Sequence, residues 1–177
     1  MGDILKAIDE ADAALLRLIY FRGRSRVLDI LMPALSLAGN RGALWILIAI
    51  LSFAFGGMTE KTASVAALAA VGISGIIAEL VMKAFIRRER PFSRFDDVRP
   101  KVRGRRFRRR PSFPSGHSAG YFAAAYSLAS FMPQYGFWFY LIAFLGAYSR
   151  AYNGVHYPGD VVAGSIIGVL VGKFVCG

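Results

Sequence analysis

The chain of 177 residues is 55% hydrophobic and only 19% charged, and its mean hydropathy is +0.45. This composition is too apolar for an ordinary soluble domain of that length, so it indicates a membrane protein. The formal net charge of +11 directs attention to anionic partners, and the single cysteine, Cys176, excludes an internal disulfide and suggests no role.

The first 23 residues are predicted to form an amphipathic helix that lies in the membrane interface. Their large aliphatic side chains fall largely on one helical stripe, which favours a helix that lies along the membrane over one that crosses it. The stripe consists of Ile4, Leu5, Ile8, Leu15, Leu16, Leu18 and Ile19. The alternative is an ordinary cytosolic amphipathic helix packed on the rest of the protein.

Apolar runs follow at 42–57, 62–86, 115–132, 136–148 and 160–176. Several approach the roughly 20 residues that cross a hydrocarbon core, and their frequent Gly and Ala predict close helix packing. Residues 26–39 are either a half-span or the first part of a span that continues into 42–57 after a break. We therefore expect an all-α polytopic membrane bundle with five or six transmembrane helices, folded as one domain over residues 1–177.

The segment 87–113 is predicted to be a basic loop at the active site. Between Arg87 and Arg110, twelve Lys or Arg residues stand against three acidic ones, so this stretch carries nine of the eleven net positive charges. Such a run beside membrane spans can be a topology signal or a patch for anionic lipids. Nucleic acid is disfavoured as a partner, because the run is fixed at both ends to apolar helices and contains few aromatic residues.

Lys83 and Arg90 lie at the end of the second long apolar run, seven residues apart. If the helix continues, this spacing is close to two turns, so both side chains point the same way and can flank one anion. Pro91 then ends the helix. The alternative for Lys83 is a side chain that extends to the lipid head groups.

Pro114-Ser115-Gly116-His117 precedes another apolar run. These are residues of a helix start, where free backbone N–H groups and the helix dipole favour a bound anion. His117 can either give a proton to a leaving oxygen or simply cap the helix. The chain has only two histidines, and both lie in polar clusters at the edges of apolar runs.

The third cluster begins with Ser149-Arg150 and ends with His156 and Asp160, four residues apart. Near a helix start, that spacing can bring the carboxylate to one imidazole nitrogen and make the other nitrogen a better nucleophile. A carboxylate at a membrane edge also needs a partner, which makes it a candidate functional group. The structural alternative for Asp160 is a helix N-cap.

Together, these clusters resemble the three signature motifs of the type 2 phosphatidic acid phosphatase family. The motifs are Lys83 with Arg90-Pro91, Pro114-Ser115-Gly116-His117, and Ser149-Arg150 with His156 and Asp160. They occur in order and without substitution over residues 83–160, about half of the chain. The family is similar to vanadium haloperoxidases and glucose-6-phosphatase, so the resemblance leaves the substrate open.

The resemblance implies a phosphohydrolase that needs no metal or other cofactor and works through a phosphohistidine. In that mechanism His156 attacks phosphorus, Asp160 orients His156, and His117 protonates the leaving oxygen and then activates water. The phosphate oxygens would be bound by Lys83, Arg90 and Arg150, with hydrogen bonds from Ser115, Gly116 and Ser149. Fixed cations of this kind supply the charge neutralisation that phosphoryl transfer requires.

The expected substrate is a lipid phosphate, because the apolar spans place the site near the membrane interface. Candidates are polyprenyl diphosphate, phosphatidylglycerophosphate, phosphatidic acid and a phosphorylated glycolipid, and the arginines from Arg103 to Arg110 are candidates for binding a doubly phosphorylated head group. We expect a multi-pass protein of the cell membrane with an outward-facing site, although the count of basic residues alone favours the cytoplasmic side. The alternatives are a non-catalytic protein that binds anionic lipids and a vanadate-dependent haloperoxidase-like enzyme.

Overall fold

The computed structural model describes residues 2–102 and 110–177, and these residues form helices and connecting segments without a β-strand. The helices are α1 (Gly2–Arg17), α2 (Arg26–Ala38), α3 (Ala43–Phe55), α4 (Met58–Ile76), α5 (Lys83–Phe85), α6 (Pro91–Arg94), α7 (Gly116–Phe131), α8 (Gly136–Tyr152) and α9 (Pro158–Cys176). A π-helical stretch, Ile77–Met82, joins α4 to α5. The all-α class predicted from the sequence is therefore confirmed.

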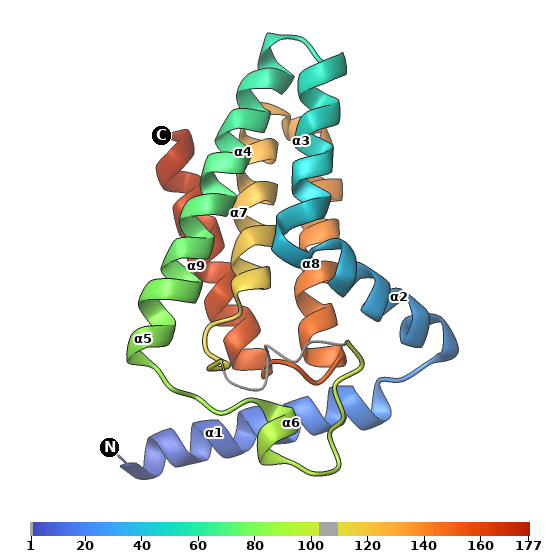
Figure 1. Cartoon of the computed structure of the whole chain (residues 1–177), viewed down its shortest axis with the longest axis vertical. Helices are drawn as coiled ribbons and strands as arrows, with labels where there is room; N and C mark the ends of the chain where they lie inside the picture. The colour runs from blue at the N-terminus through green and yellow to red at the C-terminus, as the bar shows by residue number, and fades with distance from the viewer. Residues whose placement is uncertain (1, 103–109) are drawn as a thin grey trace.

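The long helices form an upright bundle, with α7 packed against α4, α8 and α9 (Figure 1). Its core is made largely of small side chains and a few aromatic ones, as expected for helices that approach each other closely. Trp45 of α3 meets Tyr121 of α7 edge to face, with 5.7 Å between the ring centroids. Around this pair lie Ala63, Ala67, Ala124, Ala125, Leu128, Met132 and Ala143.

Helix α9 has an exposed face of large apolar side chains and an opposite face of glycines that packs on α7. Val162, Ile166, Leu170 and Phe174 recur every fourth residue on its exposed face. Gly164, Gly168 and Gly172 follow the same period on the face against α7, and a Cβ added at Gly168 would lie 2.3 Å from the carbonyl oxygen of Ala119. Glycine is therefore required here because the α7 backbone occupies the space of a side chain.

Among the described residues, two helices are long and apolar enough to cross a membrane, Met58–Phe85 and Pro158–Cys176. A third span results if α2 and α3, which are bent by 66° relative to each other, are counted as one broken span. Helices α7 and α8 occupy the predicted runs 115–132 and 136–148, but they have 16 and 17 residues. At 1.5 Å per residue they are roughly 24–26 Å long, below the roughly 30 Å of a hydrocarbon core. The structure thus supports two or three spans, and the count of five or six stays a prediction.

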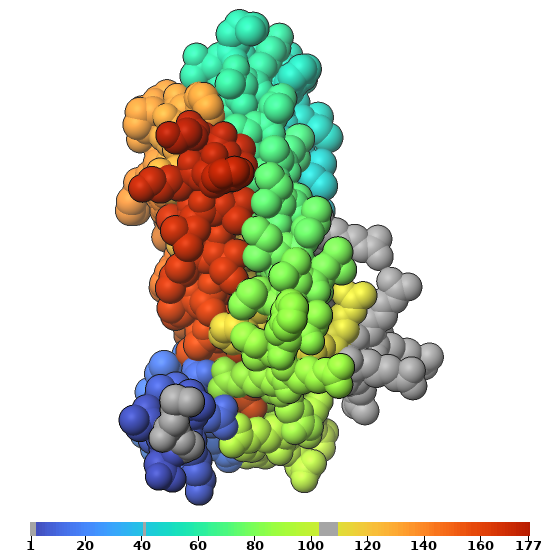
Figure 2. Space-filling view, turned by 90° about the vertical axis from the view of Figure 1, so that its left-hand side faces the viewer, coloured from blue at the N-terminus to red at the C-terminus, as the bar shows by residue number. Residues whose placement is uncertain are grey.

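Helix α1 crosses the foot of the bundle instead of running along it (Figure 1). Its aliphatic stripe is divided between two environments: Leu16 is fully buried against Ala151 and Tyr157, whereas Ile4 and Ile8 are exposed. Figure 2 shows α1 beneath α9, next to the segment that follows α5. The transverse position agrees with both the interfacial reading and the alternative of a helix packed on the bundle.

Candidate active site

The polar clusters found in the sequence come together at the foot of the bundle. Figure 1 shows that α5 and α8 end there and that α7 and α9 begin there. Each cluster lies at one of these helix ends or in the loop between α5 and α7. Helix ends carry unpaired backbone groups, so a site at this level can combine side-chain and backbone contacts.

His156 lies in the turn between α8 and α9, with Asp160 on the first turn of α9. The Nδ1 atom of His156 is 3.5 Å from Oδ2 of Asp160, and both side chains are almost completely buried. The turn depends on Gly154, whose φ of +69° is in the left-handed region that favours glycine. The backbone N–H groups of Val155 and His156 both donate to the carbonyl of Arg150, which fixes the turn to the end of α8.

The position of Asp160 fits both of the roles considered for it. Its Oδ2 atom accepts a hydrogen bond of 2.9 Å from the backbone N–H of Tyr157, so it caps the start of α9. The same oxygen accepts a hydrogen bond from the hydroxyl of Ser112 and faces His156. Capping and orientation of the imidazole are therefore compatible in one carboxylate.

Arg90 lies on the other side of the His156 ring. Its Nη1 atom is 3.2 Å from Nε2 of His156, and the guanidinium also donates to the carbonyls of Val155 at 2.9 Å and Arg110 at 2.9 Å. The four consecutive residues 87–90 are charged and follow the end of the apolar helix. The expectation that the helix reaches Arg90 and ends at Pro91 is wrong: it ends at Phe85, and Pro91 begins α6. Arg90 is extended, as residues before proline commonly are.

The charges around His156 act on its protonation. Burial, together with the positive charges of Arg90, Arg150 and Lys83, holds the pKa of His156 well below its usual value of 6.5. Burial also lowers the pKa of Arg90, to about 10, so its guanidinium stays charged at neutral pH. The result is a neutral imidazole beside a fixed cation.

Lys83 and Arg150 are both buried at this level of the bundle, and each has a partner that the sequence analysis did not single out. Lys83 donates to Oε1 of Glu79, one helical turn earlier, so it does not extend to lipid head groups. Arg150 donates to the hydroxyl of Ser36 on α2. A lysine and a glutamate four residues apart are a recognisable signal on a helix, whereas the Ser36 contact depends on the packing of α2.

The start of α7 forms as predicted, with Ser115 as the N-cap. The Ser115 hydroxyl accepts hydrogen bonds from the backbone N–H and the hydroxyl of Ser118. His117 lies in the first turn of the same helix. Ser149 is buried, and its hydroxyl donates to the carbonyl of Gly146 in its own helix at 2.6 Å. The Ser149 hydroxyl therefore donates to a backbone carbonyl of its own helix, whereas the Ser115 hydroxyl acts as an acceptor in its contacts with Ser118.

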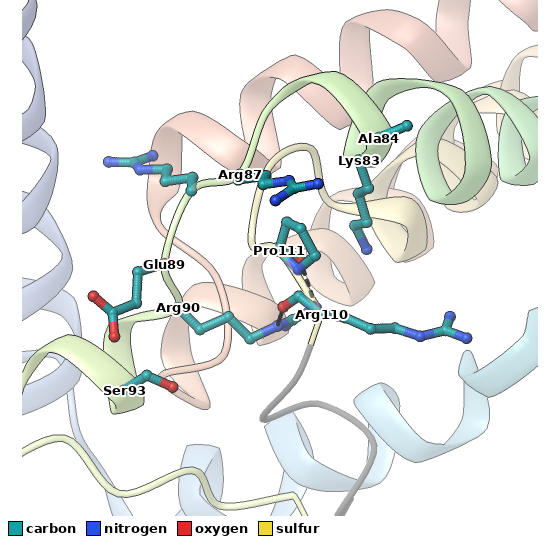
Figure 3. Close-up of a pocket in the computed structure, with 9 residues that line it drawn as sticks. Lys83, Ala84, Arg87, Glu89, Arg90, Ser93, Arg110 and Pro111 are labelled. Atoms are coloured by element: carbon teal, nitrogen blue, oxygen red, sulfur yellow. Dashed lines mark hydrogen bonds between the residues drawn. The ribbon is translucent and has the colours of Figure 1, made fainter.

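A cavity of about 440 Å³ opens beside Lys83 and Arg90. Arg87, Arg88 and Arg110 also line it, so most of the charge on its walls is positive, and Glu89 is the acid at its edge (Figure 3). The Nη1 atom of Arg110 lies 3.5 Å from Oε2 of Glu79. The residues from Arg103 to Arg109, which the sequence analysis considered for binding a second phosphate, lie outside the described part of the chain.

Arg88 and Ser112 are further residues that sequence reasoning missed. Arg88 donates to Oδ1 of Asp160 at 2.9 Å, while Ser112 bonds the other carboxylate oxygen. Arg88 lies between the motif residues Lys83 and Arg90, and the motif does not distinguish it from the residues beside it. The available signal was Asp9 and Asp12 on the packing face of α1, because acids on a buried face need a cation.

A sequence model of the PAP2 superfamily matches residues 63–176, more than half of the chain. Among solved structures, LpxE of Aquifex aeolicus is 28% identical, with a TM-score of 0.75 and 92% of each chain covered. The PAP2-type phosphatidylglycerolphosphate phosphatase of Bacillus subtilis is 27% identical, with a TM-score of 0.70, and the match covers 96% of this chain and 84% of that one.

Two curated proteins share a shorter segment with the chain. The bacitracin transport permease protein BcrC of Bacillus licheniformis is 41% identical over 64 residues, and the lipid A 4'-phosphatase of Bacteroides thetaiotaomicron is 43% identical over 58 residues. These segments cover 36% and 32% of this chain. They span only 32% and 26% of the two relatives' own lengths.

Proposed function

The chain belongs to the PAP2 superfamily, and from this premise we propose that it is an integral membrane lipid phosphatase that works through a phosphohistidine. The observation that carries the proposal is the position of His156 between a carboxylate and a guanidinium. Its Nδ1 atom faces Asp160 and its Nε2 atom faces Arg90. A neutral imidazole that donates through Nδ1 has its lone pair on Nε2, directed to where Arg90 can bind phosphate.

In the first step, Nε2 of His156 attacks phosphorus while the bond from phosphorus to the lipid oxygen breaks. His117, in the first turn of α7, gives its proton to the leaving oxygen, and Asp160 stabilises the positive charge that develops on His156. Arg90, Lys83 and Arg150 neutralise the phosphoryl oxygens, with hydrogen bonds from the α7 start at Ser115 and Gly116 and a further one predicted for Ser149.

In the second step, His117 takes a proton from water, whose oxygen attacks the phosphohistidine. The bond from phosphorus to Nε2 breaks, inorganic phosphate leaves, and both histidines return to their starting protonation states. The same cations serve both steps, because the phosphoryl group carries negative charge throughout. We propose that they replace the divalent ion used by many phosphatases.

The first test is phosphate release by the purified protein in excess chelator. We expect hydrolysis to persist without divalent ions and to be inhibited by vanadate, which mimics phosphate bonded to the nucleophile. His156→Ala should abolish the reaction, and His117→Ala should slow it by about 10²- to 10⁴-fold, as for loss of a general acid and base. With ³²P-labelled substrate, His117→Ala should accumulate acid-labile label on the protein, and His156→Ala should carry none.

Release that survives His156→Ala would show a different nucleophile, and an absolute need for a divalent ion would exclude the charge arrangement proposed here. A non-catalytic protein that binds anionic lipids would release no phosphate at all. These outcomes test the reaction independently of which lipid is the natural substrate.

The proposed substrate class is a phosphate monoester or diphosphate on a membrane lipid. The basic cavity beside Lys83 and Arg90 lies at the foot of the bundle, where a head group can enter while its acyl or prenyl chains stay against the exposed apolar faces. A screen over polyprenyl diphosphate, phosphatidylglycerophosphate, phosphatidic acid and phosphorylated glycolipid should give turnover for at least one of them. Activity confined to water-soluble esters would contradict the proposed class.

We also propose a multi-pass location in the cell membrane with the site on the outward face. The charge rule opposes this, because the loop after α5 is basic and Arg22, Arg24 and Arg26 lie near the same end. Several loop cations, however, pair with carboxylates of the protein itself: Arg88, Arg94, Lys101 and Arg110. Cations retained for such contacts are poor markers of topology.

A further inference from the structure

Arg88 connects the N-terminal helix to the proposed catalytic pair. Its Nη1 atom donates to Oδ2 of Asp12 at 2.7 Å and to Oδ1 of Asp160 at 2.9 Å, and its Nη2 atom donates to Oδ1 of Asp9 at 2.7 Å. The guanidinium carbon also lies 3.8 Å from the ring centroid of Tyr157. One side chain therefore binds three carboxylates and stacks on the turn that carries His156.

The carboxylates on α1 lie on the face that packs against the bundle. Asp9 and Asp12 are three residues apart and share this face with Ala13 and Leu16, which are buried. Asp12 makes a second contact with the site: its Oδ1 atom accepts a hydrogen bond of 2.7 Å from the backbone N–H of Gly159. Helix α1 thus holds both Arg88 and the first turn of α9.

Asp160 needs this support because its side chain is fully buried. An ionised carboxylate away from water is unstable unless its oxygens are bonded or paired with a cation. The backbone N–H of Tyr157 and the Ser112 hydroxyl bind Oδ2, whereas Arg88 binds Oδ1. With both oxygens held, the carboxylate cannot rotate away from Nδ1 of His156.

The carboxylates around Arg88 favour its charged form. Burial opposes the charge of the guanidinium, but the carboxylates of Asp160, Asp12 and Asp9 together raise the pKa of Arg88 above its usual value. A guanidinium can bind several acceptors in one plane and stack on an aromatic ring at the same time. An ammonium group can keep the charge but cannot reproduce that geometry.

We propose that Arg88 is a positioning residue for the reaction, acting through Asp160, and that Asp9 and Asp12 of α1 hold it in position. The proposal rests on the proposed function, because it assigns Arg88 to the nucleophile's support. Every side-chain hydrogen bond described for Arg88 goes to a carboxylate, although its side chain also lines the cavity. A role in binding substrate phosphate is the competing assignment.

The test measures kcat and KM separately for Arg88→Gln and Arg88→Lys. We expect Arg88→Gln to lower kcat by about 10- to 100-fold, the scale seen when a partner that orients a functional group is removed. The KM and the inhibition constant of vanadate should change little, because the proposed phosphate ligands remain. Arg88→Lys should recover part of kcat, since it restores the charge but not the bonding pattern.

Arg17→Gln is the matched control. Arg17 lies on α1 and pairs with Asp97, in the loop that also contains Arg88, through a hydrogen bond of 3.2 Å. Its described contacts do not include Asp160. The Arg17→Gln substitution removes one positive charge and one contact between α1 and the loop. If weaker attachment of α1 were enough to impair the reaction, kcat would fall in both Arg17→Gln and Arg88→Gln. We expect Arg17→Gln to retain wild-type kcat.

A double-mutant cycle decides whether Arg88 acts through Asp160. In an Asp160→Asn background, measured with an activated aryl phosphate, Arg88→Gln should cause no further loss. An additive loss, a wild-type kcat in Arg88→Gln, or a rise in KM with kcat unchanged would overturn the proposal. If Arg88→Gln fails to fold, Arg88→Lys and Asp12→Asn decide instead: both should lower kcat at unchanged KM, and wild-type kcat in both would refute the assignment.

These results are distinguishable from failure of the proposed function. If wild-type protein releases no phosphate, or if His156→Ala remains active, the reaction itself is wrong. If His156→Ala is inactive while the Arg88 variants behave like wild type, only the positioning role is wrong.

Discussion

His156 presents its two ring nitrogens to groups of opposite charge, and this asymmetry determines its protonation. On one side Asp160 favours a proton on Nδ1, while on the other side Arg90 disfavours one on Nε2. Burial adds to the second effect, so the pKa of His156 is well below 6.5. The imidazole of His156, the proposed nucleophile, is therefore neutral at neutral pH.

This predicts the pH dependence of the reaction. The kcat/KM ratio falls as pH decreases through the pKa of the free enzyme's nucleophile, so its acid limb should lie below pH 6.5. Arg90→Gln removes a positive charge that repels the proton, which should raise the pKa of His156 and move the acid limb upward by about one pH unit. The measurement is kcat/KM against pH.

Arg90→Lys is the control for this shift, because it keeps the charge but loses the guanidinium's fixed geometry. Ionisation of the substrate phosphate is common to both variants and cancels in the comparison. An acid limb that moves equally in Arg90→Gln and Arg90→Lys would show that charge is not the cause.

The helices position the site through close backbone contact. Helix α7 is capped by Ser115 and carries His117, and α9 carries Asp160. The distance between these two helices therefore fixes the distance between the proposed phosphate cradle and the proposed support of the nucleophile. A Cβ added at Gly164 would lie 2.3 Å from the carbonyl oxygen of Ser115 itself. Small residues on α9 are thus part of the geometry of the site.

Gly168→Ala should destabilise the protein, because the new methyl group would lie 2.3 Å from the Ala119 carbonyl oxygen and force α7 and α9 apart. We expect a loss of about 1–3 kcal/mol, the usual cost of overpacking, and a lower kcat. Gly72→Ala is the same substitution in α4, where nothing lies within 4 Å. It should be stabilising by about 0.5–1 kcal/mol, as for glycine in a helix interior.

Thermal unfolding of both variants in one detergent provides the comparison. A Gly168→Ala protein as stable as wild type would mean that α9 is not held against α7 as described.

Helix existence was predictable because apolar runs are long and their ends are marked by polar clusters. The start of α7 at Gly116 was indicated by Pro114, Ser115 and Gly116, which are residues of a helix start. The end of α5 was missed: Lys83 and Arg90 fit one helical face by spacing, yet the chain leaves the helix after Phe85. Periodicity cannot distinguish a continuing helix from an extended segment of charged residues.

At the scale of the whole molecule, the site joins segments that are far apart in the sequence. The three motifs identified the residues from Lys83 to Asp160, but their partners on α1 and α2 depend on packing. Ser36 beside Arg150, and Asp9 and Asp12 beside Arg88, carry no local signal that names the partner. Motifs therefore predict the chemistry, whereas tertiary structure supplies its support.

The orientation in the membrane can be measured by cysteine labelling in intact cells. Asp96 is exposed in the loop at the foot, and Thr59 is exposed at the start of α4, at the opposite end of the bundle (Figure 1). In a Cys176→Ser background, a membrane-impermeant maleimide should label Asp96→Cys directly and Thr59→Cys only after permeabilisation. The reverse pattern would place the site on the cytoplasmic side, as the charge rule predicts.

The contact between Asp12 and Gly159 has a consequence for the biogenesis of the protein. It joins positions 147 residues apart, so a ribosome must reach the first turn of α9 before this contact can form. When α1 has already been synthesised, the nascent polypeptide still lacks both the proposed nucleophile, His156, and its carboxylate, Asp160. Under the proposed mechanism, a polypeptide released before residue 156 has no nucleophile and should be inert, however well its earlier helices have assembled.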